Sequence, residues 1–498
     1  MNTDDALTIK LIFAFKLKLL RLQKKLSYQE LSDMTGLSTS YLHDIEKAKK
    51  YPKVDKINAL AKALNVTYDY LVSTTASKKL QPIIELLNSE FFKIFPLEMF
   101  GISNYKLFEL FTNTPDKVNA FLSTIFKITR NYQMRSEHFY QAALRSYQEM
   151  YDNYFEDLEQ AVQAFKQEKD LSTEGPYSTN TLIRILISSY GIQVDRQQLV
   201  QYEELKDCRS YYSEAKKVLY LNQNLSAAQE KFLLGRELAF QYLGLTERPY
   251  ITRIVEVDSF EQLLNNFKAS YFSIALLMGE MELVRDVQEF LGQPHWEAAH
   301  FLHFLEKYDV TPEMLMQRLT NILPKHFGID DLFFLRLQGN GGHKGFKMTK
   351  ELHLSRLHSP YANYTHEHYC RRWVAINILE KLRNKSHNEL LADLQISDYW
   401  ESNNEYLCIS VAKQSHETSE EGVSVTLGLR VNPRLKKLVG FLQDPALETR
   451  EVNTTCERCA ISDCEVRAMA PVILDKKRKV DRIKAIVQEV DNEGTMRF

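Results

Sequence analysis

The stretch "SYQELSDMTGLSTSYLH" constrains the fold more strongly than any other part of this chain. Ser27 followed by Glu30 is a capping-box pattern, which begins a helix, and Gly36 allows a sharp turn after that helix. Ser38 then caps a second helix. Two helices joined by a short glycine-containing turn form a helix-turn-helix, which we expect to lie in a bundle of short helices over residues 7–73.

The charge distribution indicates that nucleic acid, if the chain binds it, binds to this bundle. Residues 1–80 contain 14 Lys and Arg against 8 Asp and Glu, whereas the whole chain has a net charge of −2. A small basic head on an acidic remainder favours contact between the head and DNA phosphates. A helical bundle with a solvated basic face is the alternative interpretation.

The segment "LSYQELSDMTGLSTSYLHDIEKAKKYP" resembles the Cro/C1-type (xenobiotic-response-element) helix-turn-helix family. The resemblance implies that Gln29 and Tyr41 contact the DNA backbone, and that Thr39, Ser40 and His43 lie nearest the bases. Lysines after the second helix are expected to contact phosphates. The predicted DNA-binding residues are Gln29, Ser38, Thr39, Ser40, Tyr41, His43, Lys47 and Lys50.

The stretch "KFLLGRELAF" has the register of a zinc-peptidase helix without its metal ligands. In His-Glu-x-x-His, two histidines one turn apart hold zinc and the glutamate acts as base. Here Arg236 and Phe240 stand at the ligand positions, and only Glu237 remains. Without a metal-bound water to deprotonate, Glu237 is expected to pair with a nearby cation.

A second helix supports a peptidase-like fold that is not an enzyme. "NNFKASYFSIALLMG" resembles the carboxylate-bearing helix of the ImmA/IrrE peptidases, which often follow Cro-type domains. It offers Asn265, Asn266 and Lys268 where a carboxylate ligand is expected. We therefore predict a degenerate zincin-like domain over residues 181–325 with no catalytic residues.

Polar breaks and β-forming runs predict the remaining organisation. "STTASKKLQP" and "DLSTEGPYSTNT" read as linkers, and the helical patterns between them predict a connector or dimerisation region over residues 83–168. Runs such as "EYLCISVAK" and "VSVTLGLRV" predict strands in an α+β sensor-like domain over residues 330–498. The predicted fold class is multidomain, mainly α, with an α+β carboxy-terminal half.

Two motifs in this half predict binding sites. The glycine turn in "LQGNGGHKGFK" has basic neighbours that either bind phosphates or form a solvated hairpin: Arg336, Lys344, Lys347 and Arg356. "CERCAISDC" places three thiols on one loop, and a fourth comes from "YCRRW", so the predicted metal ligands are Cys370, Cys456, Cys459 and Cys464. Four thiolates suit zinc or an iron–sulfur cluster, and unligated thiols are the alternative. Cys208 and Cys408 are expected in the core.

The order of these motifs is similar to the short-chain fatty acyl transcriptional regulators of bacteria. This resemblance implies an acyl-CoA sensor and, in some members, a cubane iron–sulfur cluster on the four cysteines. We predict a homodimeric regulator that binds a double-stranded DNA operator and senses a short-chain acyl-CoA, with a [4Fe-4S] cluster or zinc. The rivals are a redox sensor and an ImmA-like metalloprotease, which the missing zinc ligands disfavour. The chain has no apolar run of about 18 residues and no signal-peptide pattern, so no membrane partner and a cytoplasmic location are expected.

Overall fold

The structure is a computed structural model that describes two compact units. It covers residues 3–73, 136–339 and 345–495, except 173–174, 207, 250–256, 258, 355–366, 384, 386–388, 401 and 415–421. One unit comprises Met1–Tyr147 and Glu256–Leu263, and the other comprises Gln148–Val255 and Leu264–Phe498. Two residues of the predicted phosphate site, Lys344 and Arg356, lie outside the described residues.

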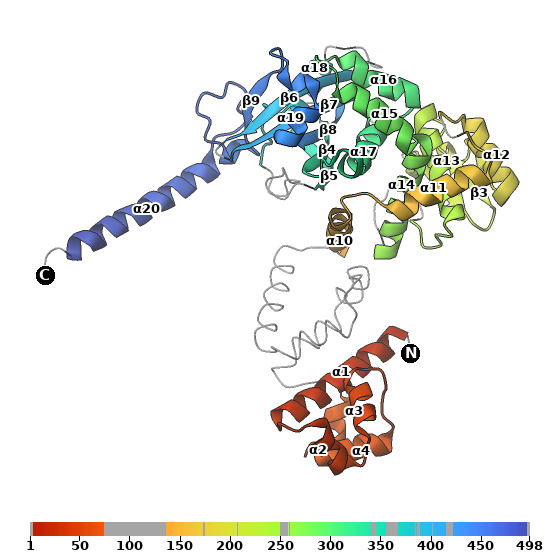
Figure 1. The fold of residues 1–498 in the computed structure, drawn as a ribbon, viewed down its shortest axis with the longest axis vertical. Helices are drawn as coiled ribbons and strands as arrows, with labels where there is room; N and C mark the ends of the chain where they lie inside the picture. The colour runs from red at the N-terminus through yellow and green to blue at the C-terminus, as the bar shows by residue number, and fades with distance from the viewer. Residues whose placement is uncertain are drawn as a thin grey trace. The chain divides into compact units, whose positions relative to one another are not determined.

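The amino-terminal unit contains the predicted bundle of short helices (Figure 1). Its core packs Leu17, Leu31, Leu42 and Leu60, all fully buried, against one another. Gly36 ends the second helix in a left-handed conformation at φ 70°, which glycine adopts without strain. The bundle helices are α1 Thr3–Gln23, α2 Tyr28–Thr35, α3 Thr39–Glu46, α4 Val54–Ala63 and α5 Tyr68–Val72, and α10 Ser136–Met150 follows in the chain.

A buried ion pair fixes the position of α3 in the bundle. Arg21 binds both carboxylate oxygens of Glu46 at 2.7 and 2.9 Å, and the Tyr28 hydroxyl donates to Glu46 at 2.7 Å. The guanidinium also lies 4.1 Å from the centre of the Tyr28 ring. A charge-assisted pair of this geometry holds the end of α3 against α1 and α2.

The second unit begins with a helical part that surrounds a small sheet. The sheet has the order β1-β3-β2, with β1 parallel and β2 antiparallel to β3. Its strands are β1 Gln193–Asp195, β2 Ser210–Ser213 and β3 Val218–Leu221. The helices are α11 Glu156–Glu168, α12 Thr179–Tyr190, α13 Ala227–Tyr242, α14 Phe260–Leu277, α15 Glu280–Leu291, α16 Ala298–Tyr308 and α17 Pro312–Ile322, which continues into the π-helical turn Leu323–Phe327.

The carboxy-terminal part is built on a six-stranded sheet of order β5-β4-β8-β7-β6-β9. All neighbours pair antiparallel except β6 and β9. The strands are β4 Leu332–Gly339, β5 Phe346–His353, β6 Leu391–Tyr399, β7 Asn404–Gln414, β8 Gly422–Arg430 and β9 Thr449–Val452. The helices are α18 Val374–Leu382, α19 Pro433–Leu438 and α20 Val472–Thr495. These elements confirm the predicted α+β half.

The central strands of this sheet are buried on both faces. Cys408 packs in the core cluster that contains α18, whereas its neighbour Ile409 lines a cavity with residues of α15, α16 and α17. Successive side chains of a strand point to opposite faces, so α18 covers one face and the three helices cover the other. Cys208 and Cys408 are both 4% exposed, as expected for core cysteines.

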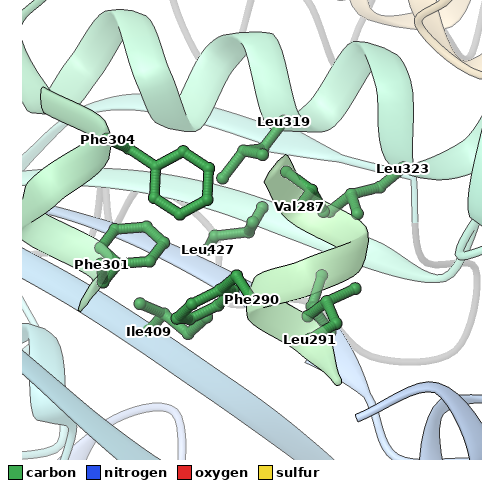
Figure 2. Close-up of a pocket in the computed structure, with 10 residues that line it drawn as sticks. Val287, Phe290, Leu291, Phe301, Phe304, Leu319, Leu323, Ile409 and Leu427 are labelled. Atoms are coloured by element: carbon green, nitrogen blue, oxygen red, sulfur yellow. The ribbon is translucent and has the colours of Figure 1, made fainter. Parts of the chain in front are cut away.

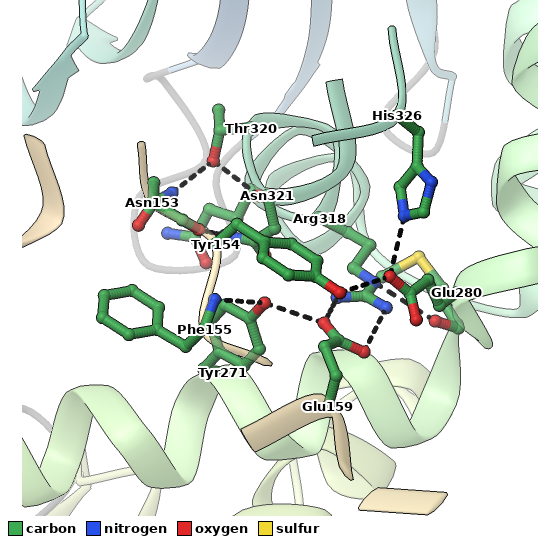
Figure 3. Close-up of polar contacts among 12 residues, drawn as sticks. Asn153, Tyr154, Phe155, Glu159, Tyr271, Glu280, Arg318, Thr320, Asn321 and His326 are labelled. Carbon is green, nitrogen blue, oxygen red and sulfur yellow. Dashed lines mark hydrogen bonds and ion pairs between the residues drawn. The ribbon is translucent and has the colours of Figure 1, made fainter. Parts of the chain in front are cut away.

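A buried polar network joins three helices of the second unit (Figure 3). Arg318 of α17, which is fully buried, binds both carboxylate oxygens of Glu159 of α11, one of them at 3.0 Å. Tyr271 of α14 donates to the same carboxylate at 2.7 Å. Helix α11, which the sequence assigned to the connector over residues 83–168, therefore packs within the second unit. The part of that connector before residue 136 lies outside the described residues.

Among the described helices, none combines the length and the apolar character needed to cross a membrane.

Candidate DNA-binding and effector sites

Helix α3 presents the predicted DNA-contacting residues at the surface of the first unit. Gln29, Ser38, Ser40 and Lys50 are exposed, whereas the other four predicted contacts are half-buried: Thr39, Tyr41, His43 and Lys47. Leu42, Ile45 and Glu46 face the core of the bundle. The division between a buried and a polar face is what a recognition helix requires, because one face must anchor the helix while the other contacts DNA.

Local hydrogen bonds orient several of these side chains. The Ser38 hydroxyl accepts from the Tyr41 amide at 3.3 Å and so caps α3, and Gln29 donates to Asp33 at 3.0 Å. Lys50 pairs with Asp44 at 2.8 Å, and this hydrogen bond raises the pKa of Lys50. Ser38 is therefore a helix cap as well as a predicted contact.

One cation beside the predicted interface was not identified from the sequence. The ammonium group of Lys56 on α4 lies 4.3 Å from the centre of the Tyr41 ring, and that of Lys50 lies 5.7 Å from it. The ammonium groups of both lysines therefore lie near the Tyr41 ring, and we add Lys56 to the candidate phosphate contacts. No local sequence signal points to Lys56, because it comes from a different helix.

The degenerate peptidase position in α13 holds an ion pair. Glu237 is 3% exposed, and Arg248 binds both of its carboxylate oxygens, one at 3.1 Å. Gln241 donates to the same carboxylate at 2.8 Å. The Arg248 guanidinium also stacks 4.2 Å from the centre of the Phe240 ring. The expectation that Glu237 pairs with a cation is confirmed, and Arg248 is that cation.

Arg236 is buried one residue before this pair. Its guanidinium bonds to Asn266 of α14, while its Nε has no hydrogen-bond partner. Burial, and then the neighbouring Arg248, lower the pKa of Arg236 to about 10. Helix α14 packs closely against α13 at this point, and a Cβ atom at Gly235 would stand only 2.4 Å from the Ser273 hydroxyl. The side chains of Arg236, Asn266 and Phe240 stand where zinc ligands are expected, and none of them is a zinc ligand.

A cluster of cations surrounds one carboxylate at the edge of the second unit's large sheet. Glu313 of α17 binds Lys350 of β5 and lies 3.2 Å from the Arg336 Nε of β4. Burial raises the pKa of Glu313, but Lys350 and Arg336 outweigh it and lower that pKa to about 2. The charges of Arg209 and Lys413 act on the same carboxylate. This basic cluster (Arg209, Arg336, Lys350, Lys413 and Glu313) carries a surplus of positive charge.

The basic cluster includes one residue of the predicted phosphate site. Arg336 belongs to it, whereas Lys347 is exposed on β5, opposite Gln338. Sequence reasoning missed Lys413, which is half-buried and whose pKa burial lowers. Only the strand register brings Lys413 and Arg336 to one face, through Val423 and Val425 of β8 between them.

A narrow apolar cavity lies on the same face of the sheet (Figure 2). It is small, with a volume of about 20 Å³, and lies between α15, α16, α17 and the strands β7 and β8. Ile409 and Leu427 form its floor, and Phe290, Phe301 and Phe304 are among the side chains that cover it. Ile409 precedes Lys413 by four residues on β7, so about 13 Å of strand separates the cavity from the basic cluster.

The predicted metal ligands lie in one region, where two distant segments pair. Tyr369 bridges Thr455 antiparallel, the Cys370 amide donates to the Thr454 carbonyl at 3.1 Å, and the Cys456 amide donates to the His368 carbonyl at 2.8 Å. Cys370, Cys456 and Cys459 are each 5% exposed. Burial raises the pKa of the Cys370 thiol to about 11, and Cys456 and Cys459 contribute to the same shift.

The chemistry of these thiols suits a soft metal, but their present spacing does not form a site. Backbone amides of Asn453 and Ala468 donate to the sulfurs of Cys370 and Cys456 at 3.5 and 3.4 Å, as amides do around cluster thiolates. Over the residues that the structure describes, no three His, Cys, Asp or Glu side chains are grouped closely enough to hold one metal ion.

Two family models match parts of the chain. The model described as Helix-turn-helix matches residues 17–71, and the model described as IrrE N-terminal-like domain, of the peptidase M78 family, matches residues 187–320. The chain therefore carries a helix-turn-helix domain ahead of an IrrE-like domain, which confirms both predictions. Its head is that of a DNA-binding regulator.

The solved structures that are similar to the chain include a Mycobacterium tuberculosis transcriptional regulator. The two share 18% sequence identity with a TM-score of 0.46, over 66% of this chain and 93% of that chain. No curated protein matches the chain.

Proposed function

We propose that the protein is a homodimeric transcriptional regulator whose second unit senses a short-chain acyl-CoA or a related fatty-acid metabolite. The helix-turn-helix head binds an operator in double-stranded DNA, with the exposed face of α3 toward the bases. The IrrE-like domain has no peptidase role in this proposal, because Arg248 neutralises Glu237 where catalysis needs a metal-bound water. Its part is to support the sensing half.

The basic cluster is the observation that supports an anionic effector. Arg336 and Lys350 pair with Glu313, and the charge of the half-buried Lys413 acts on the same carboxylate, so this region gathers basic groups that would attract an incoming phosphate. A short acyl chain matches the apolar lining of the cavity above Ile409 and Leu427, and the cavity would have to widen to admit it. An acyl-CoA carries both groups, a set of phosphates and an apolar chain.

A thermal-shift titration with a panel of acyl-CoAs tests this function. A ligand held at about 100 times its Kd adds roughly 2.7 kcal/mol to stability, so binding raises the melting temperature. Arg336→Ala and Lys413→Ala should each abolish the shift, whereas Lys437→Ala, at an exposed position on α19 outside the predicted phosphate site, should retain it. Free CoA and free short-chain acids separate recognition of the phosphates from recognition of the chain. The absence of a shift with every acyl-CoA would reject the effector class.

A second candidate input is a metal or iron–sulfur centre on the four cysteines. The paired segments and the amide-to-sulfur hydrogen bonds favour it, and such a centre would draw the thiols closer together than they are in this structure. When bound, an iron–sulfur cluster would supply redox sensitivity, and zinc would supply a cross-link between the two segments.

Metal analysis after anaerobic purification tests this second candidate, and visible absorption distinguishes an iron–sulfur cluster from zinc. Cys370→Ser should release the metal, whereas Cys408→Ser, in the core, should not. Full metal content in Cys370→Ser would remove that cysteine from the ligand set.

A further inference from the structure

The carboxy-terminal helix α20 leaves its aliphatic side chains in solvent. Every residue from Asp475 to Val490 is exposed, on all sides of the helix. The exposed fractions of Val480, Ile483, Val487 and Val490 are 49, 52, 53 and 62%. Figure 1 shows α20 continuing as one uninterrupted helix. An isolated helix of this kind gains little stability in water, and helices of globular proteins normally bury such a stripe.

The spacing of these residues is that of a coiled coil. Val480, Ile483, Val487 and Val490 follow one another at intervals of three, four and three residues, which are the a and d positions of a heptad. Their side chains therefore form one stripe along the helix. We propose that α20 binds α20 of a second copy of this chain, in antiparallel orientation, and that this contact makes the protein a dimer.

Charge complementarity identifies the second copy as the partner. The first half of the helix, residues 476–484, contains six Lys and Arg and one Asp. The second half, residues 485–495, contains Glu489, Asp491 and Glu493 and no basic residue. A parallel pair would place the two basic halves side by side. An antiparallel pair places each basic half against an acidic half, so the helix is complementary to itself.

One antiparallel register satisfies both the stripe and the charges. It sets Val480 opposite Val490 of the second copy and Ile483 opposite Val487, and the two-fold axis repeats each layer, which gives four aliphatic layers. In an antiparallel pair, e positions face e positions and g positions face g positions. By heptad position, Lys477 then faces Asp491 and Lys479 faces Glu493, while Lys484 faces Lys484 of the second copy beside the two-fold axis.

A shift of this register by one heptad places a lysine in the aliphatic seam and removes the Lys477–Asp491 pairs at its edge. The shift would set Lys476 opposite Val487 in the seam, and would replace both Lys477–Asp491 pairs and the single Lys484 pair at its edge by two Lys477–Lys484 pairs. A lysine in the seam loses part of its hydration, and two facing lysines repel each other. The four-layer register is therefore the one that the sequence specifies.

The composition of the stripe argues against a membrane or DNA as the occupant. Helices that lie on membranes carry Trp, Phe or Leu on the apolar face and basic residues along the whole polar face. The stripe of α20 is entirely Val and Ile, which favour coiled-coil seams, and the polar face becomes acidic in its second half.

Sedimentation equilibrium of the full chain tests the proposal. The native chain should dimerise with rising concentration, and Ile483→Asp or Val487→Asp should weaken the dimer at least tenfold. Ala485→Asp is the matched control, since it adds the same charge at an outward f position and should leave the dimer intact. Because the substituted side chains are exposed, the melting temperature of the second unit should not change.

A charge exchange tests the antiparallel register. One variant carries Lys477→Glu and Lys479→Glu, and the other carries Asp491→Lys and Glu493→Lys. Each variant alone should be monomeric, because its own halves repel, and an equimolar mixture should form a heterodimer. A parallel pair predicts no such rescue.

Three results would overturn the proposal. The first is a monomeric native chain at every concentration, and the second is a dimer that tolerates Val487→Asp. The third is a loss of binding to anionic vesicles or to DNA when α20 is removed, with no change in the oligomeric mass of the protein. Operator binding by the head is measured separately, so loss of the dimer and loss of the DNA-binding function are distinguishable.

Discussion

Arg248 binds both carboxylate oxygens of Glu237, at the position where a zinc peptidase would keep its catalytic base beside a metal-bound water. Glu237 is buried and Arg248 is half-buried, and the Arg248 guanidinium stacks on Phe240 and on Tyr212. A side-chain cation thus stands in for the positive charge that a metal would supply. In this IrrE-like domain, the glutamate of the peptidase register is held by an ion pair and an aromatic ring.

Arg248→Ala should destabilise the second unit by about 3–5 kcal/mol, because it leaves the carboxylate of Glu237 buried and unpaired. Chemical denaturation of the purified protein measures the loss. The double variant Arg248→Ala with Glu237→Leu should recover part of it, since no uncompensated charge remains. If Arg248→Ala unfolds at the same denaturant concentration as the native protein, the pair contributes nothing to stability.

The second prediction concerns the pH dependence that Glu313 introduces. Lys350 and Arg336 lower its pKa to about 2, below the unfolded value of 4.5. The native state therefore binds fewer protons than the unfolded state, and the stabilisation is fully present above pH 4.5 and lost as the pH falls toward 2. The contribution is about 3 kcal/mol at most. Denaturation midpoints measured between pH 6 and pH 3 should fall less steeply in Glu313→Gln, and equal slopes would contradict the assignment.

The third prediction concerns the DNA interface of α3. Lys47→Ala and Lys50→Ala should each weaken binding to all sequences alike, and should reduce the slope of log K against log salt by about one. Fluorescence anisotropy at several salt concentrations measures both effects. Lys381→Ala, an equivalent charge loss on α18 in the second unit, should change neither. An unchanged slope in Lys50→Ala would place that residue outside the interface.

The fourth prediction concerns the network in Figure 3. Arg318→Met should cost about 3–5 kcal/mol, because Glu159 then keeps a buried charge with only the Tyr271 hydroxyl as partner. Glu159→Leu combined with Arg318→Met should cost less than Arg318→Met alone. A double-mutant cycle by calorimetry gives the coupling energy, and strictly additive costs would show that the two residues do not interact.

Local chemistry made the head predictable from its sequence. The capping box joins Ser27 to Glu30, and Gly36 ends the same short helix. Their roles therefore follow from the local sequence alone. The IrrE-like domain was predictable for a related reason, because its two helices keep a recognisable order. The partner of Glu237 was not predictable, since Arg248 lies a helix end and a turn away and no spacing rule connects the two.

The basic cluster around Glu313 shows the same boundary between local and long-range information. Arg336 was predicted because a glycine turn follows it directly. Lys413 was not, because it shares a face with Arg336 only through the pairing of β4, β8 and β7. A one-residue change of register would turn Lys413 to the other face of the sheet, and the sequence alone does not determine that register.

Strand β7 acts as a shared wall between two compartments. Ile409 forms the floor of the apolar cavity on one side, and Cys408 packs on the other side with α18, whose chain leads directly back to Cys370. A displacement on the cavity side of this strand is transmitted to the other side, because the packing around Cys408 has little room in which to absorb it. A molecule that widens the cavity must therefore press on the packing beneath the cysteine segment. A change in the cavity and a change at the cysteine segment would therefore be mechanically coupled through β7 rather than independent.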